Sequence, residues 1–462
     1  MKFLFVLDNY SKYFSIDDVV RELYRRGHDI VLIMGLEKKK NVPDDAVQKA
    51  KANLPNLKIE PLLRRKFLRK FARDIRELLN YAHILNNEET RPWDASKWDR
   101  FFHPYVWHMV TSASGKKKLK DISFQKTLRS IEQKIPVVSK IRNHIKRHNP
   151  DLVIVLPLVN PDSKENEYIK ATLDLGIPCV YSMYSWDNIE SKGTFQSRPD
   201  YNIVWNKSLA VELARGHDVD PERIFVTGGP RFDRLVKNGG GYILPREEFC
   251  RIAGIDAEKK YILYVGSTFL VNSEFKKAMN EDAPALEIAD AFQQLPNTKN
   301  INVLVRPHPS NAGIVKSLQM QQRHNVFIYP VHGEFPDTEE KRQMFYNSIH
   351  HSIAVVGINT TAFLEASALD KPCITIATKE FGETQQLPHF HHLADGDFLE
   401  TANGAVEVAK IVGRIIEGAD TRSSQRHAFV KNFLKPLEPG KSAAETYADL
   451  VERLGSKNDP SI

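Results

Sequence analysis

The sequence has few cysteines and no long apolar run. Three cysteines, Cys179, Cys250 and Cys373, occur in 462 residues, and their odd number and wide spacing exclude a disulfide framework and a zinc site built on paired cysteines. Asp8 interrupts the first apolar run, so residues 1–7 predict a buried strand and not a signal peptide. No uninterrupted stretch reaches the roughly 18 to 20 apolar residues of a membrane span. We therefore expect a reducing, cytoplasmic compartment.

Glycine-rich phosphate loops are also missing. Neither GxGxxG nor GxxxxGK(S/T) occurs, which argues against a dinucleotide-binding protein and a P-loop NTPase. The composition, with 42% hydrophobic and 27% charged residues, is that of a soluble globular protein and excludes fibrous and disordered classes.

Apolar, β-branched segments alternate with segments of helical spacing along most of the chain. Strands are expected near 3–7, 30–34, 152–156, 178–182, 201–205 and 224–227, and again near 261–265, 301–306, 326–329, 353–356 and 373–377. This alternation predicts an α/β fold with two Rossmann-like, doubly wound domains. Ligands of such sheets bind outside the carboxyl ends of the strands.

Three successive glycines at 239–241 separate the two series and suit a hinge. We predict an N-terminal, acceptor-side domain over 1–240 and a C-terminal, donor-binding domain over 241–435. Residues 436–462 are expected to form a helix that crosses back to the first domain. Basic amphipathic stretches over about 60–150 predict a helical insertion in the first domain.

The net charge of +7 is modest, but its placement is uneven. Positive charge is concentrated at 64–73, 116–120 and 140–147. Such segments suit an anionic membrane surface, a polyanionic acceptor or nucleic acid, and they equally suit solvated helix faces. Both interpretations remain open on the sequence.

An apolar strand ends abruptly in Arg306-Pro307-His308-Pro309-Ser310. Rigid prolines at a strand end hold an imidazole and a guanidinium at the edge of the sheet, where both suit a phosphate. The alternative is a buried histidine that is bonded to the backbone.

A second segment runs from a strand into Gly357-Ile358-Asn359-Thr360-Thr361 and then into a helix that carries Glu365. Exposed backbone N–H groups at such a helix start make a seat for a diphosphate, lined by Asn359, Thr360 and Thr361. The Glu365 carboxylate is expected to accept hydrogen bonds from ribose hydroxyls. The alternatives are an ordinary N-cap and a surface glutamate. Gly266 and Ser267, after the strand 261–265, are assigned to the same donor site.

Three motifs carry a resemblance to a group of known families. The segments RPHPS at 306–310, GINTTAFLEASALDKP at 357–372 and FVTGGPRFDRL at 225–235 resemble the two-domain GT-B glycosyltransferases of bacterial capsule, lipopolysaccharide and teichoic-acid synthesis. CDP-glycerol glycerophosphotransferases and Kdo- and sialic-acid-transferring enzymes are the most similar. The resemblance implies that two domains face a central cleft, and that His308-Pro309 contact the nucleotide and 359–361 the donor phosphates. It also implies catalysis without a bound metal.

One departure from these families concerns the transferred group. Glycerophosphotransferases usually have an aspartate-containing loop where this chain has Gly357-Ile358-Asn359. This difference argues against transfer of glycerol phosphate.

The first domain is expected to supply the acceptor site. Asp187, in a loop after an apolar run, is the first candidate for a general base, and Asp8, at the end of the first strand, is the second. Trp186, Asn188 and Lys192 are predicted to contact the acceptor. His308 is predicted to stabilise the leaving phosphate.

These observations predict a glycosyltransferase that moves a sugar from a CMP-, CDP- or UDP-linked donor to a hydroxyl of a surface polysaccharide or lipid-linked glycan. No cofactor, metal or nucleic-acid partner is expected. The location is expected to be cytoplasmic, at the inner face of the membrane, with residues 64–73 on the lipid. A nucleotide-sugar epimerase of the same fold and a non-enzymatic polyanion- or membrane-binding protein are the alternatives.

Overall fold

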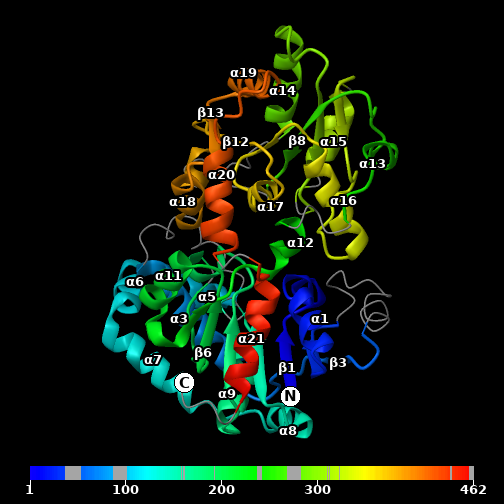
Figure 1. Ribbon diagram of the computed structural model, residues 1–462. Helices are drawn as coiled ribbons and strands as arrows, with labels where there is room; N and C mark the ends of the chain where they lie inside the picture. The colour runs from blue at the N-terminus through cyan, green and yellow to red at the C-terminus, as the bar shows by residue number, and fades with distance from the viewer. Residues whose placement is uncertain are drawn as a thin grey trace. The chain divides into compact units, whose positions relative to one another are not determined.

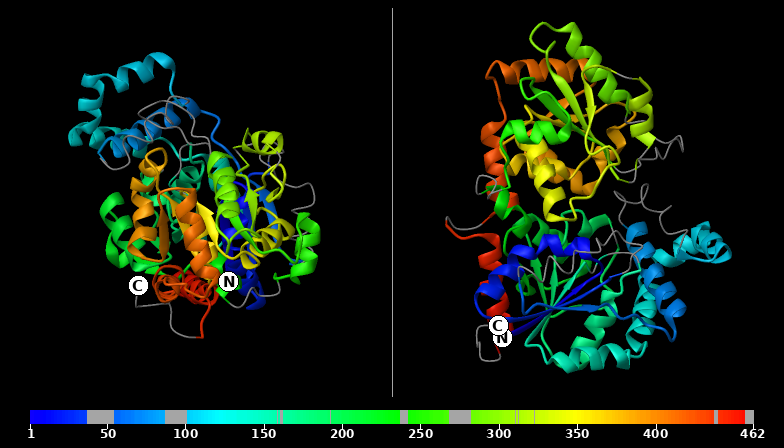
Figure 2. Two further views of the ribbon diagram at one scale, coloured as in Figure 1. Left: turned by 90° about the horizontal axis from the view of Figure 1, so that it is seen from above. Right: turned by 90° about the vertical axis from the view of Figure 1, so that its right-hand side faces the viewer.

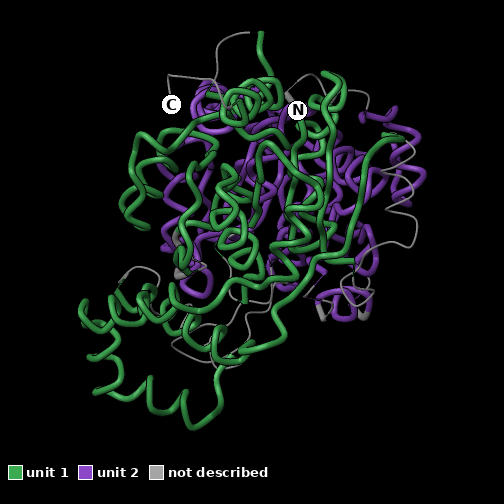
Figure 3. Tube along the Cα trace, turned by 90° about the horizontal axis from the view of Figure 1, so that it is seen from below, with its two compact units in different colours: residues 1–231, 435–462 green, residues 232–434 purple. Residues whose placement is uncertain are grey.

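The computed structural model divides into two compact units (Figure 3). Unit 1 comprises Met1–Arg231 and Lys435–Ile462, and unit 2 comprises Phe232–Leu434. The first boundary thus lies before the one predicted at residue 240, and the glycine run lies outside the described residues. The structure describes residues 1–36, 54–86, 101–157, 159, 162–191, 193–236, 242–267, 282–309, 311, 313–321, 323–436 and 440–456.

A seven-stranded sheet forms the centre of unit 1, with all paired strands parallel in the order β3-β2-β1-β4-β5-β6-β7 (Figure 1). The strands are β1 (Lys2–Leu7), β2 (Asp29–Met34), β3 (Lys58–Pro61), β4 (Leu152–Leu156), β5 (Cys179–Ser182), β6 (Tyr201–Val204) and β7 (Ile224–Val226). Chain order reverses at β1, because the first three strands extend to one side of it and β4 onward to the other. The space next to β1 and β4 is therefore the topological switch point.

The helices of unit 1 cover this sheet and form its insertion. They are η1 (Tyr10–Ser15), α1 (Asp17–Arg25), α3 (Arg69–Asn86), α5 (Pro104–Thr111), α6 (Ala113–Lys120), α7 (Ile122–Lys134), α8 (Ser139–His148), α9 (Glu165–Asp174), α10 (Asn188–Ser191), α11 (Lys207–His217), η4 (Pro221–Arg223) and α21 (Ala443–Gly455), with η5 (Pro230–Phe232) at the boundary. Alternate residues of β1, such as Phe3 and Phe5, pack with Val20 of α1 and Val451 of α21 in one buried cluster.

The insertion is helical, as predicted. Ile75 and Leu79 of α3 pack with Leu119 of α6 and Leu128 of α7 in a core of their own. In Figure 2 the cyan helices of this segment lie to one side of the sheet of unit 1. Because β3 pairs with β2, the insertion begins after residue 61.

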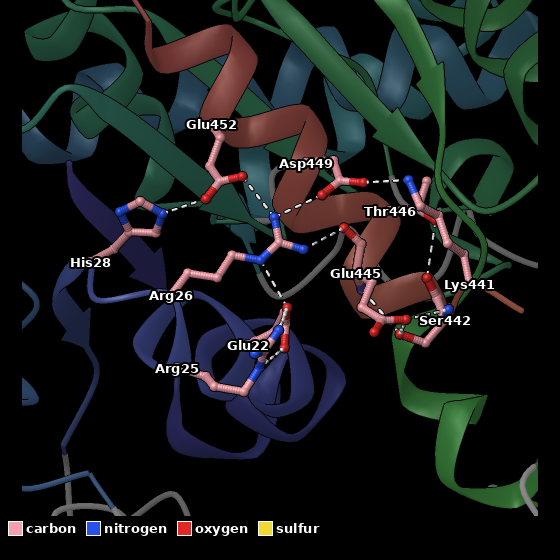
Figure 4. A network of polar contacts seen from close by, with 10 residues as sticks. All are labelled: Glu22, Arg25, Arg26, His28, Lys441, Ser442, Glu445, Thr446, Asp449 and Glu452. Atoms are coloured by element: carbon pink, nitrogen blue, oxygen red, sulfur yellow. Dashed lines mark hydrogen bonds and ion pairs between the residues drawn. The ribbon is translucent and has the colours of Figure 1, made fainter.

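The C-terminal helix α21 lies against α1 within unit 1. Figure 4 shows Arg26, just after α1, whose Nη1 donates to Asp449 Oδ1 and Glu452 Oε2 at 2.7 Å each. A capping box of Ser442 and Glu445 starts the helix. The last segment of the chain thus completes the fold of the first unit.

Unit 2 repeats the same plan with a six-stranded parallel sheet, ordered β10-β9-β8-β11-β12-β13. The strands are β8 (Tyr261–Val265), β9 (Asn302–Arg306), β10 (Val326–Ile328), β11 (Val355–Gly357), β12 (Cys373–Ile376) and β13 (Leu399–Ala402). Its helices are α12 (Asp233–Val236), α13 (Arg246–Ala253), α14 (Asp282–Gln294), α15 (Gly313–Gln321), α16 (Glu339–His350), α17 (Ala362–Ala368), η6 (Gly382–Gln386), α18 (Pro388–Asp395), α19 (Ala405–Ile416), α20 (Ser423–Phe429) and η7 (Val430–Leu434). Chain order reverses here at β8.

The fold class predicted from the sequence is confirmed: two Rossmann-like parallel sheets with crossover helices. Within the described residues, no helix is both long and apolar enough to cross a bilayer.

Candidate active site

The donor motifs of unit 2 meet at the switch point of its sheet. Strand β8 lies between β9 and β11, and its last residue, Val265, is in register with Arg306 of β9 and Gly357 of β11. A Cβ on Gly357 would lie 3.1 Å from Val265 O, so the two strand ends approach closely. The segments that follow, 266–267, 307–309 and 358–361, therefore leave the same edge of the sheet side by side.

His308 is half-buried at this edge. Its ring stands edge-on to Phe335, with centroids 5.4 Å apart. Behind it, a Cβ on Gly333 (φ +64°) would lie 2.8 Å from Pro307 O, so the loop after β10 supports the His-Pro segment closely. Burial lowers the pKa of His308 below its usual range. The imidazole is therefore neutral near pH 7, with one N–H to donate and one nitrogen that accepts.

Arg306 is not placed to contact a phosphate directly. Its side chain is 5% exposed, its Nη2 donates to Glu334 O at 3.1 Å, and its guanidinium lies 4.7 Å from the ring centroid of Phe345 on α16. Burial lowers its pKa to about 10, so the cation persists at neutral pH. The guanidinium therefore supports the loop behind His308, which contains its hydrogen-bond partner Glu334.

The start of α17 also differs from the prediction. The N–H groups of Ala362, Phe363 and Leu364 bond to Thr360 Oγ1, Thr360 O and Thr361 O, and the helix is only seven residues long. It therefore offers no row of open N–H groups from its first turn. The side-chain amide of Asn359 donates to Thr384 O at 2.7 Å. Donor contact by 359–361 remains a prediction for the loop and not for the helix start.

The remaining residues that were predicted to bind the nucleotide donor differ in their surroundings. Glu365 is 2% exposed within α17, so it is no surface glutamate, and Ser267 is 4% exposed. The N–H of Gly266 donates to Arg306 O at 3.0 Å and continues the β8–β9 ladder. Pro309 is half-buried beside His308. Ser310 lies outside the described residues.

On unit 1, Asp8 lies where β1 ends, at the switch point of the first sheet. Its Oδ1 lies 3.3 Å from Lys164 Nζ, and its Oδ2 accepts from Asn9 Nδ2 at 3.1 Å. Nearby, burial and then the charge of Asp8 raise the pKa of Glu165 above its usual range. The sequence pattern did not single out Glu165.

Asp187 lies in the loop between β5 and α10 and is half-buried. Its neighbours Trp186 and Asn188 were predicted to contact the acceptor, but they are 2% and 4% exposed. The Asn188 side chain donates to Val159 O at 3.2 Å. Both residues therefore anchor the loop that presents Asp187. Lys192 lies outside the described residues.

The loop of Asp187 also contains a residue that the sequence did not reveal. Lys12 Nζ lies 3.5 Å from the ring centroid of Tyr184. Burial raises the pKa of Tyr184, but Lys12 and Arg231 outweigh it and leave the pKa below its usual value. Lys12 follows β1 and Tyr184 follows β5, so only the parallel sheet brings them together.

Within the described part of the chain, one trio of metal-ligand side chains is close enough to share an ion. Ligand atoms of Glu60, His144 and His148 lie within 4.8 Å of one another. Glu60 Oε2 already bonds to His144 Nε2 and to Arg147 Nη2 at 2.6 Å each. These contacts hold β3 against α8. Catalysis without a metal stays a prediction.

Two Rossmann-like units, each with its candidate residues at the carboxyl edge of a parallel sheet, define the GT-B class of fold. A family model described as CDP-glycerol:poly(glycerophosphate) glycerophosphotransferase matches residues 184–335. This range runs from Tyr184 through Asp187 to His308 and ends at Phe335. The fold confirms the predicted GT-B architecture, and the family match over a third of the chain is a similarity to a transferase that uses a nucleotide-linked donor.

Solved structures agree with this fold. A UDP-GlcNAc 2-epimerase from Methanocaldococcus jannaschii has a TM-score of 0.56 at 13% identity and covers 98% of this chain and 100% of its own. The wall teichoic acid polymerase TagF has a TM-score of 0.52 at 14% identity and covers 98% of this chain and 88% of its own. A glycosyltransferase from Rickettsia africae has a TM-score of 0.53 at 13% identity, with 99% of each chain covered. No curated protein sequence matches the chain.

Proposed function

We propose that the protein transfers a sugar from a CMP- or CDP-linked donor to a hydroxyl group of a surface polysaccharide or lipid-linked glycan. The observation that carries this proposal is the meeting of β8, β9 and β11 at one switch point, with the neutral imidazole of His308 held there by Phe335 and Gly333. The family match, whose printed name includes a CDP-linked donor, supports a cytidine nucleotide.

In the proposed reaction, each unit supplies its own ionisable groups. Asp187 accepts the proton of the acceptor hydroxyl as its oxygen attacks the donor carbon. The bond from that carbon to the nucleotide phosphate breaks, and the phosphate leaves with the electron pair. The N–H of His308 and the backbone of 357–361 stabilise the charge that develops on the leaving phosphate. Arg306 acts indirectly, by holding the loop behind His308.

The family match favours a second candidate reaction, transfer of glycerol phosphate from CDP-glycerol. The two reactions break different bonds. Sugar transfer from a CDP-linked donor breaks the carbon–oxygen bond and releases CDP. Glycerol phosphate transfer breaks the diphosphate and releases CMP.

The epimerase relatives favour a third candidate, because one of them covers the whole fold. The test incubates the protein with a panel of CMP-, CDP- and UDP-linked donors and follows the nucleotides by ion-exchange chromatography. We expect the donors to be stable without an acceptor and to release nucleotide when a phosphate-containing glycan acceptor is added. CDP release from a CDP-linked sugar supports the proposal, and CMP release from CDP-glycerol supports the second candidate. Isomerisation of a UDP-linked sugar without acceptor would establish an epimerase.

An association with the membrane surface is part of the proposal. Phe67 and Phe71 are 78% and 46% exposed among the basic residues of 64–73. Exposed aromatic rings interleaved with arginine and lysine suit the interface of an anionic bilayer. A lipid-linked acceptor would place the enzyme there, and sedimentation with phosphatidylglycerol and phosphatidylcholine vesicles tests the association.

A further inference from the structure

Two histidines and one carboxylate join an edge strand of unit 1 to a helix. Glu60 lies on β3, and His144 and His148 lie on α8 (Figure 1). One ligand atom of each side chain lies within 4.8 Å of those of the other two. We infer that these three side chains bind a zinc ion, which links β3 to α8.

The spacing of the two histidines suits a shared ion. Side chains four residues apart lie on the same face of a helix, and the two imidazole centroids are 5.6 Å apart. Each ring faces a different oxygen of the same carboxylate. His144 Nε2 lies 2.6 Å from Glu60 Oε2, and His148 Nε2 lies 3.2 Å from Glu60 Oε1.

These distances need little adjustment to hold an ion. Zinc lies about 2.0 to 2.2 Å from nitrogen and oxygen ligands, so neighbouring ligand atoms of a tetrahedral site are about 3.4 Å apart. The contacts of 2.6 and 3.2 Å lie just below this value, and the limit of 4.8 Å lies above it. Side-chain shifts of about 1 Å therefore open a tetrahedral site between the three residues.

The imidazole of His148 is buried and its coordinating nitrogen is not yet satisfied. The residue is 8% exposed. Its Nε2 faces Glu60 but has no hydrogen-bond partner in the part of the chain that the structure describes. A buried polar atom without a partner costs free energy. A bond to a metal ion would supply the missing partner.

The imidazole of His144 is equally buried, at 7% exposed, and its tautomer depends on Glu60. Its Nε2 bonds to Glu60, whereas its Nδ1 has no hydrogen-bond partner among the described residues. Because the partner of one ring nitrogen fixes the proton on the other, the contact with Glu60 is what keeps the proton on Nε2. An ion bound to that carboxylate would move the proton to Nδ1, and Nε2 would then coordinate the ion.

The donor set favours zinc over the common hard cations. Imidazole nitrogens suit zinc and neighbouring transition metals, whereas magnesium and calcium take oxygen ligands. Three protein ligands leave a fourth position. Since the Glu60 side chain is 26% accessible, water can fill that position. The ion takes no part in the transfer reaction proposed above.

Arg147 competes with the ion for the carboxylate. Its Nη2 lies 2.6 Å from Glu60 Oε2, and its side chain is 64% accessible. Ion pairs of such exposed side chains contribute little to stability, so the guanidinium can turn into solvent when an ion binds. Loss of the Arg147 charge should therefore strengthen zinc binding.

The position of the site indicates a structural role. Glu60 and His144 are 84 residues apart in the sequence, and helices α3, α5, α6 and α7 lie between them. A link between these two residues closes the base of the insertion. Because such a link limits the freedom of the unfolded chain, the ion would stabilise the insertion against the sheet of unit 1.

The test measures zinc binding to the metal-free, full-length protein by calorimetry. The wild type is expected to bind one equivalent of Zn²⁺ that H148Q and E60Q bind about tenfold more weakly or not at all, because each lacks one of three ligands. H108Q is the matched control, since His108 is exposed on α5, and it should bind zinc as the wild type does. Mg²⁺ and Ca²⁺ should not bind at this site.

Two further measurements separate a metal site from an ion pair. Co²⁺ in place of zinc should give the visible absorption of a four-coordinate ion in the wild type and in H108Q, and not in H148Q or E60Q. Zinc should slow amide exchange in peptides that cover 58–61 and 139–148 of the wild type. R147Q should bind zinc more tightly, and weaker binding by R147Q would contradict coordination by Glu60.

Failure of the wild type to bind zinc would overturn the inference and leave the three side chains as an ion-pair network. Retention of the same equivalent in both H148Q and E60Q would overturn it as well, because the ion would then lie elsewhere. Circular dichroism checks that each variant is folded. If H148Q does not fold, E60Q carries the comparison, since Glu60 is partly exposed.

Discussion

Replacement of Asp187 by asparagine is expected to lower turnover by about 100- to 10,000-fold, the usual contribution of a general base, while donor binding is retained. Asparagine has the same shape but cannot take up a proton. The loop that presents Asp187 is anchored by Trp186 and Asn188, which are buried, so the substitution should leave the fold intact. The measurement is initial-rate kinetics with a saturating donor, together with calorimetry of donor binding.

Two companion variants make this result specific. D218N is the matched control, because the Asp218 side chain is 90% accessible and its left-handed backbone tolerates asparagine (φ +53°). It should keep full activity. D8N tests the second candidate base, whose carboxylate pairs with Lys164. If D8N loses turnover and D187N does not, the base is Asp8, and the acceptor hydroxyl lies at the end of β1.

Replacement of His308 by alanine is expected to weaken the binding of CMP or CDP by about 10- to 100-fold, which corresponds to the loss of one hydrogen bond to a charged phosphate. His308 contacts Phe335 at the edge of the sheet and is only half-buried, so its truncation should not unfold unit 2. Thermal-shift and calorimetric titrations of the wild type and the variant provide the comparison.

The control for this variant is H332A. His332 is exposed in the loop after β10, close in sequence to Phe335 and Gly333, and it should bind nucleotide as the wild type does. H308Q retains a side-chain N–H and should recover part of the lost affinity. Wild-type affinity of H308A for CMP, CDP and UDP alike would show that the donor does not contact this imidazole.

Much of the fold follows from the sequence because parallel strands are buried on both faces. Segments such as 152–156 and 261–265 are continuous apolar runs, and every residue in them is buried. The position of the His-Pro motif was also predictable, because prolines end a strand at a definite residue. Strand ends lie at one edge of a parallel sheet, so two separate motifs could be assigned to one site.

The sequence could not show which polar side chains are occupied by the protein itself. Arg306 was assigned to a phosphate, but its partners Glu334 and Phe345 come from later segments that only the fold brings near. The segment 64–73 was interpreted as a surface for lipid or polyanion or as a solvated helix face. Arg65 instead bonds to Glu167, far along the chain. The local pattern of charge therefore gave no sign that Arg65 is paired inside the protein.

The central claim, that the ends of β8, β9 and β11 bind the donor nucleotide, is tested most directly by hydrogen exchange. Amide exchange of the full-length protein is measured by mass spectrometry with and without saturating CDP. Slower exchange is expected in peptides that cover 265–267, 306–309 and 357–361, and in the control H332A as well as in the wild type. Unchanged exchange in all three segments while CDP is bound, with protection elsewhere in the chain, would contradict the account.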